Sequence, residues 1–307
     1  MLLILFIFAH NLLLKKQQFL IPNRQMKDIV CIGHVTLDKI VTPEKEVYMP
    51  GGTTYYFAHG MSSLNNDTVS FQLVASLAES EMNAVDDMRS KGIDVKVINS
   101  RKSVFFENIY GANQNDRQQR VRAKADPFTI DSVQGIEAKY ICLGSLLADD
   151  FPLDVVKYLS QHGTIVMDAQ GYLREVRGEE VFACDWKDKL EYFKYIDILK
   201  VNEQEIATLT GISDYHEAAR QLAAWGIKEV LLTLGSEGSL LLVDGEFYEV
   251  PAVQPRRVVD ATGCGDTFTM GYVYKRVQGA SPADAAAFAA LVSARKLEDH
   301  GPFKGNL

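Results

Sequence analysis

The sequence predicts an α/β fold with a mostly parallel central sheet flanked by helices. From Asp28 onward, short apolar runs alternate with amphipathic stretches, the pattern of strand–helix–strand units whose strands pair in parallel. The 307 residues, 47% hydrophobic and 23% charged, are enough for one main core and a modest appendage. A formal net charge of -8 argues against nucleic acid or an anionic membrane as the principal partner and favours a small-molecule substrate.

Residues 1–25 are predicted to be an N-terminal extension outside the fold, which then occupies residues 26–307. Residues 1–14 are almost wholly apolar, but they contain His10 and Asn11 and fall short of the roughly 20 residues that a membrane helix needs. They also lack the positively charged start and the cleavage site of a secretory signal. The four cysteines are scattered without a Cys-x-x-Cys pair, so we expect no zinc site, no disulfide framework and a cytoplasmic location.

The alternating pattern assigns each element in order. Core strands are expected at residues 29–33, 69–74, 140–143, 164–168, 196–201 and 229–233, and helices at 54–64, 79–91, 153–161, 204–210 and 215–225. Asp214 and Glu217 are spaced as a capping box for the last of these helices. Two further helices, at 267–277 and 282–296, close the chain, and Ser281 suits the cap of the second. The turn at residues 244–245 predicts a hairpin, which adds antiparallel strands at one edge of the sheet.

Two segments interrupt this alternation, near residues 36–50 and 95–125. Both have the pattern of strands or hairpins without helices, and the second contains a polar loop at residues 111–116. The chain has no internal repeat, low-complexity tract or interdomain linker. We therefore expect these segments to form the appendage of a single domain.

The stretch 260–266 carries the strongest indication of chemistry. Gly263 and Gly265 flank Cys264 just before a predicted helix, so backbone N–H groups can face an anion, and the helix N-terminus adds positive partial charge. Asp266 falls in the first helical turn, where this field favours its ionised form and leaves it able to accept a proton. An anion site beside a carboxylate base suits phosphoryl transfer to an alcohol. The alternative is that Asp266 only caps the helix and the glycines only turn the chain.

The chain lacks the sequence motifs of two common nucleotide-binding folds. The turn at residues 33–38 has a single glycine instead of Gly-x-Gly-x-x-Gly, and the chain has no Gly-x-x-x-x-Gly-Lys-Ser/Thr. Residues 260–266, Asp-Ala-Thr-Gly-Cys-Gly-Asp, instead resemble the signature Asp-Thr-x-Gly-Ala-Gly-Asp of the ribokinase-like (PfkB) carbohydrate kinases. Ala261 and Cys264 depart from that signature but leave its glycines and its acid in place.

This resemblance implies a ribokinase-like α/β fold in which the segments near 36–50 and 95–125 form a small β-sheet lid over the sugar site. It implies that the amides of Gly263, Cys264 and Gly265 form the anion hole for the transferring phosphoryl group, and that Asp266 deprotonates the acceptor hydroxyl. It also implies ATP and Mg²⁺ as cofactors, and it leaves open a homodimer formed through the lid.

The resemblance assigns five residues to the substrate: Asp38, Gly51, Gly52, Gln170 and Arg174. Asp38 would accept hydrogen bonds from two sugar hydroxyls at once, and the glycine pair would let the backbone approach the substrate closely. Taken singly, Asp38 could be a plain turn residue and Arg174 an exposed residue at a helix start. Tyr56 stands where many ribokinase relatives have Asn, and Gly-Gly-x-x-Tyr-Tyr resembles the inositol-kinase-like branch. The rings of Tyr55 and Tyr56 could pack against the apolar face of a cyclic polyol.

The resemblance assigns further residues to the donor. Asn202 and Glu205 match the family's Asn-x-x-Glu motif, with Asn202 at the nucleotide and Glu205 orienting magnesium through its waters. Without the resemblance, such a pair more often caps a helix. Thr233, Gly235 and Gly238 match the Thr-x-Gly-x-x-Gly turn, whose backbone would lie along the nucleotide phosphates.

Cys264 has two interpretations. A thiol at a helix N-terminus among amide donors should have a lowered pKa and react readily. Alternatively, Cys264 is a small buried hydrophobe of which only the backbone N–H matters.

These observations predict magnesium-requiring, ATP-dependent phosphorylation of a hydroxyl on a small sugar or cyclic polyol. The first alternative is a nucleoside kinase or sugar-phosphate kinase of the same family. A phosphosugar is included because four basic residues could meet its phosphate: Arg117, Arg120, Arg122 and Lys124. The second alternative is a catalytically silent relative that binds sugar and nucleotide as a sensor.

Overall fold

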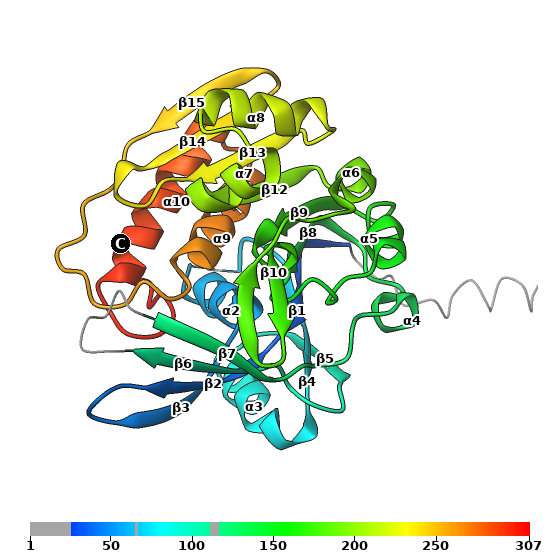
Figure 1. Cartoon of the computed structure of the whole chain (residues 1–307), viewed down its shortest axis with the longest axis vertical. Helices are drawn as coiled ribbons and strands as arrows, with labels where there is room; N and C mark the ends of the chain where they lie inside the picture. The colour runs from blue at the N-terminus through cyan, green and yellow to red at the C-terminus, as the bar shows by residue number, and fades with distance from the viewer. Residues whose placement is uncertain (1–25, 65–66, 111–116) are drawn as a thin grey trace, which may run out of the picture.

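The computed structural model describes residues 26–64, 67–110 and 117–307, and within these ranges the chain forms two β-sheets (Figure 1). The extension predicted for residues 1–25 and the polar loop at 111–116 lie outside the described residues. Within the described ranges, no helix is both long enough and apolar enough to cross a bilayer.

The large sheet has nine strands in the order β15-β14-β13-β12-β9-β8-β1-β4-β5. Neighbours from β13 to β5 are parallel, whereas β14 and β15 are antiparallel, as predicted. The hairpin turn between β14 and β15 has positive φ at both Asp244 and Gly245, as a two-residue turn of this kind requires. The strands are β1 (Lys27–His34), β4 (Phe71–Leu77), β5 (Val95–Asn99), β8 (Ala138–Gly144), β9 (Thr164–Asp168), β12 (Ile198–Asn202), β13 (Glu229–Thr233), β14 (Ser239–Val243) and β15 (Glu246–Val250).

Helices cover both faces of the large sheet because its parallel strands are apolar on both faces. Along β1, Ile29 and Cys31 pack into the core cluster shared with α2, α9 and α10, while Val30 and Ile32 pack into the cluster shared with α5, α7 and α8 (Figure 1). The helices are α2 (Thr53–Leu64), α3 (Met82–Ser90), α4 (Ile130–Val133), α5 (Leu153–Leu159), α6 (Lys189–Tyr192), α7 (Glu203–Thr210), α8 (Tyr215–Ala224), α9 (Cys264–Val277) and α10 (Pro282–Leu297).

The predicted caps account for where two of these helices begin. The Ser281 side chain accepts from the N–H of Asp284, with Pro282 as the first residue of α10. The Asp214 side chain accepts from the N–H of Glu217 at the start of α8, which is one of the two hydrogen bonds of the predicted capping box. Four short 3₁₀ helices complete the described elements: η1 (Glu79–Glu81), η2 (Ala169–Leu173), η3 (Phe193–Tyr195) and η4 (Gly235–Glu237).

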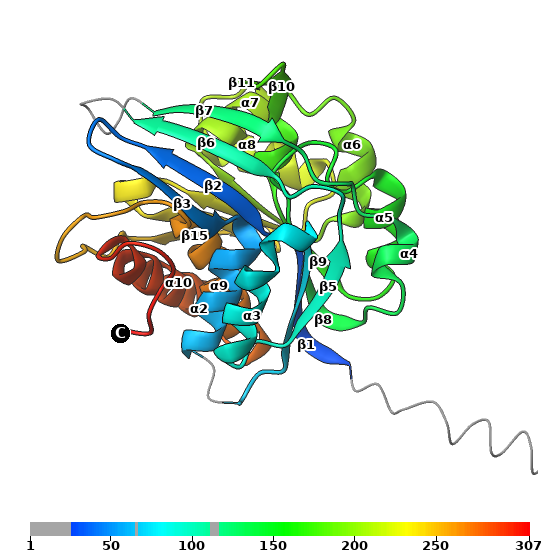
Figure 2. The ribbon, with the colours of Figure 1, turned by 90° about the horizontal axis from the view of Figure 1, so that it is seen from below.

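The small sheet has six strands in the order β10-β11-β7-β6-β2-β3. It grows from the carboxyl ends of the large sheet, because β2 begins two residues after β1 ends and β10 follows β9 through η2. Figure 2 shows β2, β6 and β7 side by side along one margin of the molecule. The strands are β2 (Thr36–Val41), β3 (Glu46–Gly51), β6 (Phe105–Tyr110), β7 (Arg117–Ala123), β10 (Arg174–Arg177) and β11 (Glu180–Ala183).

Two features of the small sheet differ from the sequence prediction. The lid segment near 95–125 was placed too early, because β5 pairs in parallel with β4, Leu73 opposite Val95, and so belongs to the large sheet. The β10–β11 hairpin was not predicted. Its strands are short and strongly charged, and its turn contains Gly178 with positive φ. The sequence therefore has little of the alternation of apolar and polar residues that predicts a strand.

Candidate functional site

The residues singled out by sequence converge at the carboxyl edge of the large sheet. Asp168 and Asn202 end the parallel strands β9 and β12, and Thr233 ends β13 beside Asn202. The N-terminus of α9 reaches the same edge, since Lys200 in β12 lies against Gly265. A Cβ built on Gly265 would stand 3.1 Å from the Lys200 ammonium. The carboxyl edge of a parallel sheet is where α/β proteins commonly bind ligands.

Asp266 lies in the first turn of α9 and is surrounded by polar groups. The Thr53 hydroxyl donates a hydrogen bond to its carboxylate. Burial and the negative charge of Asp168 raise the pKa of Asp266 to about 6, although Lys200, Thr53 and Arg174 oppose that rise. The expected effect of the helix N-terminus, a carboxylate held in its ionised form, is therefore outweighed by desolvation. Asp266 is still mostly ionised at neutral pH and is a stronger base than an ordinary aspartate.

The turn before Asp266 is held by close packing. Gly263 caps α9 with φ of 76°, and a Cβ at this position would lie 2.3 Å from the Tyr56 ring. The N–H of Cys264 donates to the Ala261 carbonyl at 3.2 Å, so this amide is already occupied, in contrast to the predicted anion hole of three amides. The N–H of Gly265 belongs to the first turn of α9, whose N–H groups have no acceptor within the helix.

The Cys264 thiol does not have the lowered pKa that a helix N-terminus would give it. Burial raises its pKa to about 11, and Asp260 and Asp266 add to the rise while Lys296 opposes it. The sulfur lies 3.9 Å from the Ser293 carbonyl of α10. The interpretation of Cys264 as a reactive thiol is therefore wrong, and its side chain is part of the α9–α10 packing.

Three of the residues assigned to the substrate lie in or directly after β2 and β3 of the small sheet: Asp38, Gly51 and Gly52. Asp38 is buried in β2 and accepts a hydrogen bond from the Thr36 hydroxyl at 2.7 Å. A Cβ on Gly51 would stand 2.4 Å from the Asp38 carboxylate, and one on Gly52 would stand 2.6 Å from the His34 carbonyl. The glycine pair therefore lets β3 pass directly beside Asp38.

Gln170 and Arg174 lie at the two ends of η2. The N–H of Gln170 donates to Asp168. Arg174 begins β10 instead of a helix, and its positive charge opposes the rise that burial causes in the pKa of both Asp266 and Glu205.

The rings of Tyr55 and Tyr56 belong to the protein core. Tyr55 is 8% exposed and Tyr56 is 3% exposed, and both belong to the core cluster around α2 and α9. The Tyr55 ring packs against His59, with centroids 4.4 Å apart. Both rings are therefore packed within the protein instead of standing open to a cyclic polyol, since ten of the twelve residues of α2 are buried.

Asn202 and Glu205 form a reciprocal capping box at the start of α7. The Asn202 side chain accepts from the N–H of Glu205, and the Glu205 carboxylate accepts from the N–H of Asn202, both at 2.8 Å. Gly235 and Gly238 follow Thr233 in a turn at the end of β13, both with positive φ.

The carboxylates at the site fit a magnesium ion that keeps most of its waters. Among the described residues, no group of three or more His, Cys, Asp or Glu side chains could hold a metal. Magnesium commonly keeps several waters and takes its other ligands from substrate phosphates, so a single carboxylate is enough to orient it. Glu205, with Lys200 3.9 Å away, fits that indirect role.

The basic residues of the small sheet are engaged with carboxylates. Arg122 pairs with Glu107 and Glu179, and Lys124 pairs with Asp149 at 3.3 Å. Arg120 lies opposite Glu107 in the ladder. The Arg117 side chain lies outside the described residues.

Lys200 is the main residue of this site that the sequence motifs do not predict. It is 4% exposed, and its ammonium lies 3.0 Å from Asp168. The available signal was a lysine within an otherwise apolar strand, since buried lysines are rare unless paired.

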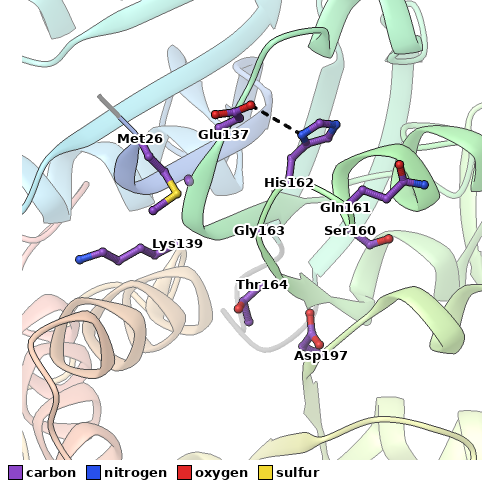
Figure 3. A pocket seen from close by; sticks show the side chains of 10 residues that line it. Met26, Glu137, Lys139, Ser160, Gln161, His162, Gly163, Thr164 and Asp197 are labelled. Atoms are coloured by element: carbon purple, nitrogen blue, oxygen red, sulfur yellow. Dashed lines mark ion pairs between the residues drawn. The ribbon is translucent and has the colours of Figure 1, made fainter. Parts of the chain in front are cut away.

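A hollow of about 580 Å³ lies elsewhere, at the amino ends of β8 and β9 (Figure 3). Of the charged groups that line it, His162 and Glu137 are 4.0 Å apart, and the Lys139 ammonium pairs with Asp28 at 2.7 Å. In Figure 3 the Lys139 side chain points away from His162. This open hollow lacks a convergent polar group, and we place the candidate site at the opposite, carboxyl edge.

The contact between Gly263 and Tyr56 can be tested by adding a methyl group. Gly263→Ala should lower the free energy of unfolding by about 1–2 kcal/mol for the left-handed backbone. The clash with the ring should cost about 1–3 kcal/mol more. Gly279→Ala is the matched control, because Gly279 has φ of 85° and nothing lies within 4 Å of the new methyl. Equal losses in denaturant unfolding of the two variants would contradict the packing role of Gly263.

Comparison with known proteins gives relatives along nearly the whole chain. Residues 26–305 match the family described as pfkB family carbohydrate kinase. A cytidine kinase from Thermococcus kodakarensis is 27% identical over 271 residues, covering 81% of this chain and 88% of the relative. A 1-phosphofructokinase from Haloferax volcanii is 31% identical over 194 residues, covering 61% of this chain and 57% of the relative.

Solved structures share the architecture. A pyrophosphate-dependent kinase in the ribokinase family, complexed with a pyrophosphate analog and myo-inositol, has a TM-score of 0.81 and 30% identity, over 90% of this chain and 97% of that one. Arabidopsis thaliana ribokinase, complexed with ribose and ATP, has a TM-score of 0.72 at 20% identity, over 91% and 95%. The fold is therefore the ribokinase-like α/β fold with a second, smaller sheet, and the chain belongs to the pfkB family of carbohydrate kinases.

Proposed function

We propose that this protein transfers a phosphoryl group from ATP, in the presence of magnesium, to a hydroxyl of a neutral sugar or cyclic polyol. The observation that carries the proposal is the position of Asp266. This carboxylate directly follows the Gly263–Gly265 turn at the N-terminus of α9, and its pKa is raised to about 6. A base with a pKa near the working pH, beside a site for an anion, meets the two needs of phosphoryl transfer to an alcohol.

Each residue then has a role in positioning or charge. Asp266 takes the proton of the acceptor hydroxyl, and the amides of Gly263 and Gly265 stabilise negative charge on the transferring group. Glu205 would hold the waters of a magnesium ion on the donor, and that ion would supply positive charge to the phosphates. Asp38 of β2 lies beside Gly51 of β3 and accepts hydrogen bonds from the substrate hydroxyls. The small sheet acts as a lid over the substrate.

The pairing register of the small sheet favours a neutral substrate. Asp38 lies opposite Phe106, and Phe106 opposite Val121, so these three residues share one face. Lys39 lies opposite Glu107, and Glu107 opposite Arg120, so these charged residues share the other face. A substrate held by Asp38 would therefore not meet Arg120, and Arg122 is already paired with Glu107 at 2.5 Å.

A second candidate donor is pyrophosphate. It is favoured because the related solved structure with 30% identity over 90% of this chain is a pyrophosphate-dependent kinase complexed with myo-inositol. The Gly263–Gly265 turn would serve either donor, since both present a terminal phosphoryl group on a phosphoanhydride. The turn from Thr233 to Gly238 would matter more for ATP, because only ATP carries a nucleoside.

A substrate panel tests the proposal. Purified protein should phosphorylate myo-inositol or another neutral sugar or polyol at least tenfold more efficiently, by kcat/KM, than any sugar phosphate. Tenfold corresponds to about 1.4 kcal/mol in transition-state binding. The panel pairs inositols, pentoses, hexoses, nucleosides and sugar phosphates with ATP and with pyrophosphate. Preference for fructose 6-phosphate would overturn the neutral-substrate assignment, turnover only with pyrophosphate would replace ATP as the donor, and binding without turnover would identify a sensor.

Replacing the proposed base tests the mechanism. Asp266→Asn should lower kcat by about a hundred- to ten-thousand-fold, with little change in the donor's KM. Because the base works only when deprotonated, the wild-type rate should rise with pH through about 6, and this limb should disappear in the variant. Asp284→Asn is the control, since Asp284 occupies the first turn of α10 away from the site. Near-normal turnover of Asp266→Asn would remove Asp266 from the mechanism.

A further inference from the structure

Lys200 is a buried cation that contacts three elements of the site. Its ammonium lies 3.0 Å from the Asp168 carboxylate at the end of β9 and 3.9 Å from the Glu205 carboxylate at the start of α7. A Cβ on Gly265, in the first turn of α9, would stand 3.1 Å from the same nitrogen. The Lys200 side chain thus lies beneath the turn that carries Asp266.

Lys200 faces two buried carboxylates, and Arg174 is a second cation that acts on Glu205 and Asp266. Asp168 and Glu205 are both buried, and a buried carboxylate without a counter-charge is strongly disfavoured. The single positive charge of Lys200 faces both carboxylates. The negative charge of Asp168 also acts on Asp266 and raises its pKa. The same negative charge would oppose a phosphate donor at the Gly263–Gly265 turn.

We propose that Lys200 is a positioning residue for phosphoryl transfer: its ammonium holds the ends of β9 and α7 against the Gly265 turn and offsets their negative charge at Asp266. This inference rests on the proposed function. In this role Lys200 acts through Asp266 and through the charge at the anion site, and it takes no proton from the acceptor.

Other groups besides Lys200 also affect the pKa of Asp266. Arg174 opposes the rise in the Asp266 pKa, as Lys200 does, and the Thr53 hydroxyl donates to the carboxylate. Among the described residues, the titratable and charged groups that act on Asp266 or respond to it include Cys31 of β1, Tyr56 of α2, Asp168 of β9, Arg174 of β10, Lys200 of β12 and Cys264 of α9. Of these, Lys200 and Asp168 form the closest recorded ion pair, so changing either one is the most direct perturbation.

The test removes the charge of Lys200 while keeping an unbranched side chain. In Lys200→Met, the midpoint of the acid limb of kcat should move upward by about one pH unit or more, the usual effect of losing an adjacent opposite charge. A second readout needs no turnover: the carboxyl carbon of Asp266, observed by NMR in protein labelled with ¹³C at aspartate and assigned by its absence in Asp266→Asn, should titrate with the same upward shift. The control is Lys228→Met, which removes an exposed ion pair with Asp197 and should leave both midpoints unchanged.

If Lys200→Met fails to fold, a variant that removes a negative charge tests the same role of Lys200. Asp168→Asn removes one negative charge, keeps an oxygen that can accept from the N–H of Gln170, and should move both midpoints downward. The double variant Lys200→Met/Asp168→Asn should return the midpoints toward those of the wild type.

The outcomes separate this inference from the proposed function. Midpoints that stay fixed in folded Lys200→Met, or that move upward in Asp168→Asn, overturn the role of Lys200 whether or not the enzyme turns over. Shifts in the NMR titration of a protein that transfers no phosphoryl group from either donor support the charge relation and overturn the proposed function.

Discussion

The contact between Gly263 and the Tyr56 ring is the constraint on which the geometry of the site depends. It fixes the start of α9 against the start of α2, where Thr53 donates to Asp266. The start of α2 is itself held by two strands, because Cβ atoms on Gly33 and Gly144 would stand 2.6 Å and 2.9 Å from the methyl groups of Thr54 and Thr53. A series of close approaches, each possible only at glycine, thus connects β1 and β8 to the carboxylate of Asp266.

The electrostatics of the site follows from the same packing. A helix N-terminus stabilises negative charge within its first turn, but that effect is small compared with the cost of burying a carboxylate beside another one. Asp168 cannot move away from Asp266, because one of its oxygens accepts from the N–H of Gln170 and the other pairs with Lys200. The fold therefore raises the pKa of Asp266 to about 6 by burying its carboxylate and by holding the like charge of Asp168 in place.

Much of this arrangement could be predicted from local patterns. Alternating apolar runs predicted the parallel sheet, Ser281 and Asp214 predicted two helix starts, and the glycines at 263 and 265 predicted a turn against a helix. The assignment of β5 to the large sheet, the burial of Tyr55 and Tyr56, and the raised pKa values of Asp266 and Cys264 depend on which distant residues pack together. A motif specifies backbone shape, whereas burial and charge at the site come from long-range contacts that the motif does not contain.

The central claim is that the acceptor hydroxyl lies at Asp266, under the small sheet and beside the Gly263–Gly265 turn. A crystal structure with the preferred polyol and a non-hydrolysable donor tests this claim most directly. The account predicts an acceptor oxygen about 2.6–3.2 Å from the Asp266 carboxylate, with the terminal phosphoryl group on the amides of the turn. A polyol bound away from Asp266, for example in the hollow at the amino ends of β8 and β9, would contradict it.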